Sequence, residues 1–487
     1  MADEITTRAQ LIDALRLASE LEHGLMAQYL FAAYSLKRYD YEGLAPEQIE
    51  RVRRWASLIT LVARQEMEHL GLALNLLSAI GGTPSFSRPN MPQRLNYYGA
   101  VKIKLTLTRG DLETIKRFQR FEAPDELAQP EPPESSDPPQ PIDQAKAREW
   151  CTQRVGVGRA EVAAALEAES GLLTAAPHID LLYGVPYQSV QELYQKITSG
   201  FERLCNELGE RNLFIGRPEN QLFGGPSSPQ HGTMNDLNQY GLDIIGVTDL
   251  ASAKQATRMI VEQGEGVRVP PSYLPFTHFC IFTRIREEME EYGLGDKAAR
   301  PVVPNPMTVL QPDVAVVEEV SRITDKHTRE VAQLFNESYE VMLLLLLYLY
   351  SDQVKTKAQT DALMDAAFFP FMTMFIRPLA EILTEIPAFE DKPGNAGPGF
   401  ELAGDVILFP DLDETWTLFQ ERIDSLVAGY QRVVSMGDPW LTLAGQRTAR
   451  GKPSQIWQRL DYLRQSMERL AADWQANWLN IGRTTEV

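Results

Sequence analysis

The sequence predicts an all-α protein, with an amino-terminal helical bundle, a long loop-rich insertion in it, and a second, carboxyl-terminal helical domain. Apolar residues recur at helical spacing through roughly the first eighty residues, and the alternation typical of strands is scarce along the chain. Four more helical patterns follow residue 312. Because a chain of 487 residues exceeds what one hydrophobic core usually holds, we expect two domains.

The amino-acid composition argues against nucleic acid and anionic membranes as partners of this protein. Hydrophobic residues make up 44% of the chain, as in soluble proteins, and the formal net charge of -19 would repel nucleic acid and anionic membranes. The first ten residues lack the order of a secretory signal, and the longest apolar run, 341–350, is about half of what a bilayer requires. We therefore expect a cytoplasmic protein with a small-molecule substrate, no nucleic-acid partner and no membrane partner, and a homodimer as a candidate assembly.

The three cysteines, Cys151, Cys205 and Cys280, are odd in number and have no CxxC spacing. Neither a disulfide framework nor a thiolate zinc site is expected from this pattern. A metal ion in this protein would have to be held by carboxylates and imidazoles.

The first two predicted helices form an antiparallel hairpin. One spans roughly residues 7–37, and the other begins at Pro46, a favoured first helical residue, and ends at the glycine pair 81–82. Residues 82–186 are expected to be an irregular insertion. Seven prolines between 124 and 141 make its stretch 123–142 a mobile surface segment.

Three shorter helices complete the expected amino-terminal domain, residues 1–299. One follows Ser189, one covers about 249–263, and one begins at Thr277, whose hydroxyl can cap it. Residues 300–312, which begin "RPVVPNP", are expected to be a linker to the carboxyl-terminal helical domain, 313–487.

The first two helices each carry acids on an apolar face. Steps of four and three along the first helix meet Leu11, Leu15, Ala18, Glu22, Leu25, Tyr29, Ala32 and Leu36. The same steps along the second helix meet Val52, Trp55, Ile59, Val62, Glu66, His69, Ala73, Leu76 and Ile80. Because such steps keep residues on one helix face, Glu22, Glu66 and His69 should point inward with the apolar residues.

Buried carboxylates on facing helices require a positive partner, because an isolated buried charge is costly. The candidates are a buried lysine or arginine, a proton, or a metal cation. No basic residue shares the two faces, and Glu66-x-x-His69 has the spacing by which helix bundles hold paired iron or manganese ions. The residues alone leave iron and manganese as candidates for such a pair of ions.

The remaining ligands of such a site are less defined. Glu192 lies off the apolar face of its helix and can form a capping box with Ser189. Glu262 and Glu265 are spaced i and i+3, but the glycines beside Glu265 are also typical of a helix end. His278, on the first turn of its helix, is either a neutral ligand or a polar residue at a helix start.

Several stretches resemble a known family. "ELEHGLMAQYL" followed by "RQEMEHLGLALNLLSAIGG" resembles the ferritin-like superfamily. With "RPNMP", "YQSVQELYQKI", "IVEQGEGV", "THFCIFTRI", "FIRPLAEILTEIP" and "NAGPGFEL", the chain looks like the ferritin-like family of iminophenyl-pyruvate dimer synthase domains over roughly 8–405. Such domains occur in enzymes that couple amino-acid-derived imines on the way to violacein and rebeccamycin-type indolocarbazoles.

The resemblance implies a diiron-type ferritin-like four-helix bundle. It implies that Glu22, Glu66 and His69 are metal ligands, and it leaves Glu192, Glu262, Glu265 and His278 as the other candidates. The chain departs from the symmetric pattern because its fourth helix lacks Glu-x-x-His, which leaves one or two ions open. Some relatives are described with haem, so the form of the iron stays open as well.

The function that we expect is an O2-dependent oxidase or oxidative coupling enzyme, which takes O2 as co-substrate and a small amino- or imino-acid-derived substrate. Tyr29, two turns after Glu22, is the candidate catalytic residue, as a hydrogen-bond donor or electron relay; the alternative is a core tyrosine. The other candidate functions are iron handling as a ferroxidase, a manganese catalase, and a non-catalytic helical scaffold with a structural ion. The long segment 82–186 favours a site that encloses a substrate.

Overall fold

The computed structural model describes residues 4–93, 104–124, 127, 142–154, 187, 189–229, 235–264, 277–309, 317–351, 356–407, 412–443 and 453–478. These residues are overwhelmingly helical, as predicted. Their only sheet pairs two residues of β1 (Pro306–Met307) in parallel with two of β2 (Ser321–Arg322).

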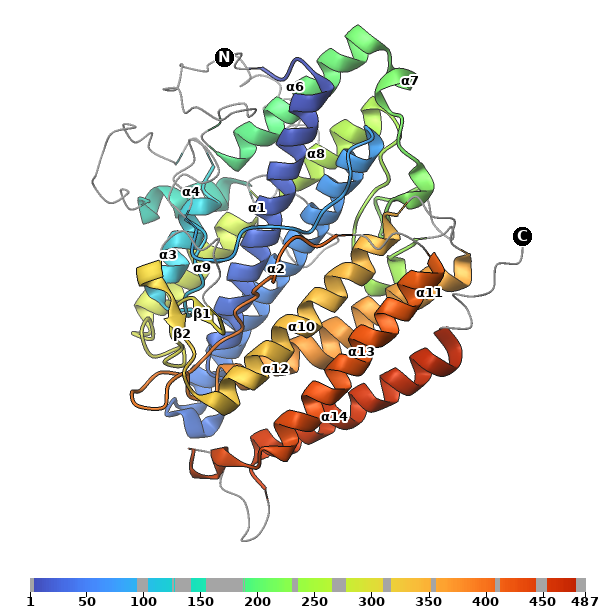
Figure 1. Ribbon diagram of the computed structural model, residues 1–487. Helices are drawn as coiled ribbons and strands as arrows, with labels where there is room; N and C mark the ends of the chain where they lie inside the picture. Colours follow the sequence, from blue (N-terminus) through green and yellow to red (C-terminus); the bar gives the residue numbers. More distant parts are fainter. Residues whose placement is uncertain are drawn as a thin grey trace.

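The amino-terminal hairpin is confirmed. Helix α1 (Arg8–Ser35) is capped by the Thr7 side chain, and α2 (Pro46–Ala79) begins with a proline at its first position. Gly81 follows α2 with φ of 82°, the left-handed conformation in which glycine commonly terminates helices. The two helices pack side by side along most of their length (Figure 1).

Four shorter helices pack against this hairpin. α6 (Val190–Leu208) and α8 (Leu250–Gly264) pack on each other along one half of it, and α3 (Leu112–Phe121) and α9 (His278–Glu291) do so along the other half (Figure 1). The third and fourth places of the four-helix bundle are therefore each filled by two helices, α3 with α6 and α8 with α9.

The predicted insertion 82–186 contains two of the described helices, α3 and α4 (Gln144–Arg154). Most of its proline-rich part, 123–142, lies outside the described residues. α4 packs on α9 through a small apolar cluster of its own, which is separate from the main core: Ala123, Ile142, Ala147, Trp150, Phe279 and Cys280.

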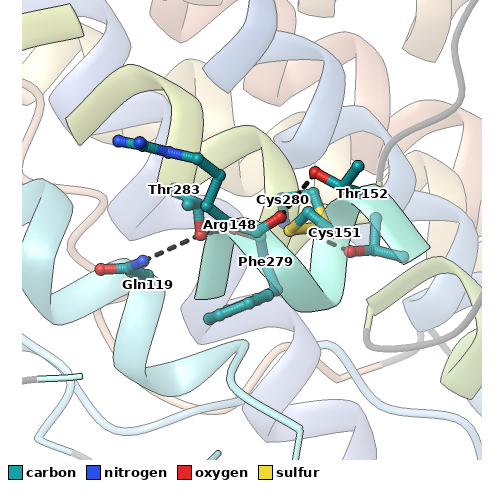
Figure 2. The surroundings of a disulfide bond; sticks show 8 residues. Gln119, Arg148, Cys151, Thr152, Phe279, Cys280 and Thr283 are labelled. Carbon is teal, nitrogen blue, oxygen red and sulfur yellow. Dashed lines mark hydrogen bonds between the residues drawn. A yellow bond between two sulfur atoms is a disulfide. The ribbon is translucent and has the colours of Figure 1, made fainter. Parts of the chain in front are cut away.

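A disulfide bond joins α4 to α9. Cys151 and Cys280, with Cα atoms 5.8 Å apart, are bonded, and Cys205 is free. Figure 2 shows the bond at the start of α9, with Phe279 and Thr283 beside it. The cysteine pattern, which indicated no disulfide framework, did not reveal this bond, because residues 129 apart in sequence meet only through the packing of α4 on α9.

The carboxyl-terminal helices form a second layer (Figure 1). α10 (Lys326–Leu349) packs against α11 (Lys357–Ala366), a π-helical stretch (Ala367–Ile376), α12 (Arg377–Leu383) and α13 (Leu412–Ser435). α14 (Gln455–Asp473) packs on α13 and continues into a π-helical turn, Trp474–Trp478. The short helices elsewhere are α7 (Glu210–Leu213) and the 3₁₀ turns Asp40–Glu42, Pro218–Asn220, Asn238–Tyr240, Val317–Glu319 and Pro439–Thr442.

One helical run among the described residues, Lys357–Leu383, is long and apolar enough to cross a membrane by length and composition, with a mean hydropathy of 1.4. Half of its most apolar window, 50%, is buried against the rest of the protein. Core helices of soluble proteins have the same properties, so this run is weak evidence for a membrane span.

The described part of the predicted linker, 300–309, is packed between the two groups of helices. The Arg300 guanidinium donates to the Glu42 carboxylate at 2.6 Å, to the Tyr34 carbonyl at 3.1 Å and to Thr384 Oγ1 at 2.9 Å. Buried apolar residues of both groups belong to one connected cluster, which extends from Ile5 to Trp474. The division into domains 1–299 and 313–487 stays a prediction.

We predict that Arg300→Met lowers the free energy of unfolding by about 3 kcal/mol, because it leaves the Glu42 carboxylate, whose side chain is only 10% exposed, without its cation. Urea titration followed by circular dichroism measures this loss. The double variant with Glu42→Leu should lose less than the single variant, because both charges are then gone. Arg203→Ala is the control, because its ion pair with Glu207 is exposed and should change stability by less than about 1 kcal/mol. A single variant as stable as the wild type would contradict the prediction.

Candidate metal centre

Four helix ends meet beside the middle of α1 and α2. α3 and α8 end there, and α6 and α9 begin there, around a small pocket. The pocket is lined by Glu22, Leu25, Glu66, His69, Phe121, Glu122, Val190, Gln191, Tyr194, Ile260, Val261, Gly264 and His278. The acids and the histidine predicted to lie on the apolar faces of α1 and α2 therefore line one pocket.

Glu66 is the centre of the cluster. Its Oε2 lies 3.0 Å from His69 Nδ1, and its Oε1 lies 3.0 Å from His278 Nδ1. Two groups of donor atoms share it, Glu22–Glu66–His69 and Glu66–Glu122–His278, and within each group the atoms lie within 4.8 Å of one another. One carboxylate thus presents an oxygen to each of two sites.

Glu22 and Glu122 complete the two groups from opposite sides. Glu22 Oε2 lies 3.6 Å from His69 Nδ1, and Glu122 Oε2 lies 3.4 Å from His278 Nδ1. All five side chains are buried. In the part of the chain that the structure describes, no lysine or arginine pairs with these three acids, so their positive partners are the two imidazoles.

Two tyrosines hold the outer carboxylates. The Tyr194 hydroxyl donates to Glu22 Oε1 at 2.7 Å, and the Tyr29 hydroxyl donates to Glu122 Oε1. Burial raises the pKa of both phenols, so they stay protonated donors. Each outer carboxylate therefore has one oxygen occupied by a tyrosine and the other turned to a histidine.

The charges of the cluster shift its pKa values strongly. Burial raises the pKa of Glu22 to about 7. Burial also opposes ionisation of Glu66, but the charges of His69 and His278 outweigh it and hold the Glu66 pKa below its usual value. Burial would lower the histidine pKa values; Glu66 instead raises that of His69 well above normal, and Glu66 with Glu122 raises that of His278 to about 9. Without metal, protons on the imidazoles thus neutralise the acids.

The residues fit a pair of transition-metal ions. Three carboxylates and two imidazoles are the oxygen and nitrogen donors that iron and manganese take in helical bundles. His278 Nδ1 is buried and makes no aligned hydrogen bond, although Glu66 Oε1 is near, so its lone pair can serve a metal ion. Glu66 belongs to both groups and would help to hold each ion.

The predicted site residues fall into three groups. The structure brings together Glu22, Glu66, His69 and His278. It does not bring Glu192 or Glu262 into the cluster: Glu192 pairs with Lys196 at 2.9 Å, one turn along its own helix, and its backbone N–H is capped by Ser189. Glu262 is half-buried, and the residue after it on α8 reaches the site. Glu265 lies outside the described residues.

Glu122 and Tyr194 were missed by sequence reasoning. Glu122 follows Ile115 and Phe118 at steps of three and four, so the signal used for Glu22 is present. α3 has only 10 residues, so its apolar face is too short to recognise in the sequence. Tyr194 lies on the apolar face of α6, where a tyrosine is ordinary core.

A family model described as ferritin-like matches residues 15–287, which contain all five residues of the cluster. The chain is 26% identical over 442 residues to dichlorochromopyrrolate synthase of Lentzea aerocolonigenes, covering 84% of this chain and 37% of that protein. It is 22% identical over 409 residues to 2-imino-3-(indol-3-yl)propanoate dimerase of Chromobacterium violaceum, covering 79% and 33%. The chain thus spans about a third of the length of these relatives. Among solved structures, a ferritin-like protein from Caulobacter vibrioides matches with a TM-score of 0.41 and 17% identity, covering 75% of this chain and 94% of that one.

We predict that the metal-free protein loses stability as the pH rises from about 6.5 to about 9. The folded-state pKa values of His69 and His278 lie above the ordinary value of about 6.5, so their contribution is full below that pH and is lost as the pH rises through the folded-state values. The raised pKa of Glu22, about 7, acts in the same direction.

Melting temperatures in the presence of a chelator, measured at intervals from pH 6 to pH 9, test this prediction. His278→Gln is the control and should flatten the decline, because one of the titrating imidazoles is gone. A wild-type melting temperature that stays level or rises across this range would contradict the prediction.

Proposed function

This chain belongs to the ferritin-like family, and on that premise we propose that it holds two iron ions and couples amino-acid-derived imines oxidatively with O2. The observation that carries the proposal is Glu66, whose two oxygens face the Nδ1 atoms of two different histidines. The relatives named above are a synthase and an imino-acid dimerase, which supports an enzyme of specialised metabolism. Manganese, which takes similar ligands, is the alternative metal.

The ligands divide into two sets in this proposal. Glu22, Glu66 and His69 would hold one ion, and Glu66, Glu122 and His278 would hold the other. A pair of iron ions, when bound, supplies two-electron reduction of O2 and hence an oxidant for an organic substrate. The protein contributes a buried position for this chemistry and keeps the Nδ1 atoms turned toward it.

The pocket wall supports an organic substrate. Leu25, Phe121, Val190, Ile260 and Val261 line it beside the cluster, so an apolar or aromatic side chain of an imino acid could lie against this wall. Iron handling and peroxide dismutation take small inorganic substrates and do not require such a wall. A scaffold with a structural ion does not require a pocket. The oxidase therefore remains the function that the site supports best.

The reaction balances with O2 as the oxidant. Joining two imine or enamine molecules through one new carbon–carbon bond breaks one C–H bond on each, which releases two electrons and two protons. O2 takes up both to give hydrogen peroxide. Tyr29 and Tyr194, which stay protonated, would not act as bases in this scheme; they keep Glu122 and Glu22 in place.

We predict that Glu66→Ala abolishes binding of both iron ions, whereas His69→Ala and His278→Ala each abolish one. The difference follows from Glu66 belonging to both groups of donors. Metal analysis after anaerobic loading with Fe²⁺ measures the number of ions, and circular dichroism checks that the helices remain. Glu192→Ala is the control and should bind as the wild type does. Unchanged iron content in Glu66→Ala would end the two-ion proposal.

We predict that the iron-loaded protein takes up one O2 for each dimer formed from a 2-imino-3-arylpropanoate, generated by mixing the corresponding 2-oxo acid with ammonium. An oxygen electrode and mass spectrometry measure uptake and product, whose mass is twice that of the imine less two hydrogens. Ile260→Trp should block turnover by filling the pocket while iron content stays unchanged, and Ile260→Leu is its control. Uptake of O2 with Fe²⁺ alone in repeated cycles would favour iron handling, and release of O2 from peroxide would favour a catalase.

A further inference from the structure

Both histidines of the cluster point their outer nitrogen at a glutamine. His69 Nε2 lies 2.8 Å from Gln263 Oε1, and His278 Nε2 lies 3.2 Å from Gln65 Oε1. A glutamine carbonyl oxygen only accepts hydrogen bonds, so the nitrogen that faces it carries the hydrogen. The inward Nδ1 of each ring is then the atom that is left for the metal.

We propose that Gln263 and Gln65 are positioning residues, which fix the orientation of His69 and His278 so that each presents Nδ1 to its own metal ion. The inference rests on the proposed two-ion site and extends it to residues outside the ligand set. It assigns one glutamine to each ion. Of the two histidines, Gln263 contacts His69 of the first group, and Gln65 contacts His278 of the second.

Glu68 sets the direction of the Gln263 amide. Gln263 Nε2 donates to Glu68 Oε2 at 3.5 Å, so the NH2 end of the amide faces Glu68 and its carbonyl end faces His69. Glu68 and His69 are neighbours on α2, and Gln263 lies in the last turn of α8. One buried amide thus bridges two adjacent side chains of α2 and also ties the end of α8 to the site.

Gln65 makes the corresponding contact with His278, but here the glutamine is on α2 and the histidine is on the shorter helix. Gln65 lies on α2, directly before Glu66, and accepts from His278 at the start of α9. The first histidine is therefore held by a residue of α8 and the second by a residue of α2. Because the two contacts lie on different helices, one can be removed without the other.

Hydrogen-bond partners of metal-bound histidines set ring orientation, and their loss typically costs about 10–100-fold in metal affinity. We expect Gln263→Leu to weaken one ion by about that factor and leave the other unchanged, and Gln65→Leu to do the reverse. The test is titration of the metal-free full chain with Co²⁺ alone, without O2, followed by calorimetry and absorption. Glu22→Ala and Glu122→Ala, which each remove a ligand from one group, identify the two binding steps.

A second readout reports on the histidine rings themselves. In the Co²⁺-loaded wild type, proton NMR should show two shifted, exchangeable signals, one from each Nε2–H. In Gln263→Leu, the His69 signal should exchange faster with solvent, because its acceptor is gone. The pair Glu68→Gln with Gln263→Glu keeps an acceptor for His69 and a donor at position 68, and it should restore the affinity and the signal.

The outcomes separate this inference from the proposed function. A wild type that binds no Co²⁺ overturns the two-ion site itself. A wild type that binds two ions while Gln263→Leu keeps both affinities and both signals overturns the positioning role. Equal weakening of both ions in Gln263→Leu, or failure of the exchanged pair to restore binding, also overturns it, because either result reflects general loss of structure.

Discussion

The buried charge of Glu66 is the constraint on which the rest of the structure depends. An ionised carboxylate in an apolar interior costs several kcal/mol unless cations surround it, and Glu66 has an imidazole at each of its oxygens. The cations are protons on His69 and His278 when metal is absent, and metal ions would take their place. Glu22 and Glu122 also lie near the Nδ1 atoms of these imidazoles, since every acid in the cluster needs a positive neighbour.

Around Glu66, the side-chain atoms of the cluster that point away from it are hydrogen-bonded either to a tyrosine donor or to a glutamine acceptor. Tyrosine hydroxyls occupy one oxygen of each outer carboxylate, and glutamine carbonyls occupy the outer nitrogen of each imidazole. The second oxygens of the outer carboxylates and the Nδ1 atoms of the imidazoles therefore point into the cluster. Because these partners come from α1, α2, α6 and α8, the ligand geometry is set by packing of the whole bundle. This preorganisation lowers the cost of gathering like charges when a metal ion binds.

The helices and half of the cluster could be predicted from the sequence, because both are local signals. Glu22, Glu66 and His69 lie on long apolar faces, and the ferritin-like resemblance read from the same stretches is confirmed by the family match. Glu122 could not be recognised on a helix as short as α3, and the pairing of Cys151 with Cys280 depends on how α4 packs. Glu192 was proposed because a third-helix acid was sought; its capping and its pair with Lys196 are the local explanation.

The third and fourth helices of the bundle are each broken into two, α3 with α6 and α8 with α9, and the pocket lies at these breaks, beside the buried cluster. α1 is buried at every residue from Leu21 to Ser35, with α10 covering its outer side where His23 meets Tyr339. Continuous third and fourth helices would enclose the remaining sides as well. The ends of α3, α6, α8 and α9 instead bring Glu122 and His278 to the cluster and leave apolar side chains around a space beside it. The same breaks therefore complete the cluster of acids and histidines and leave a pocket beside it.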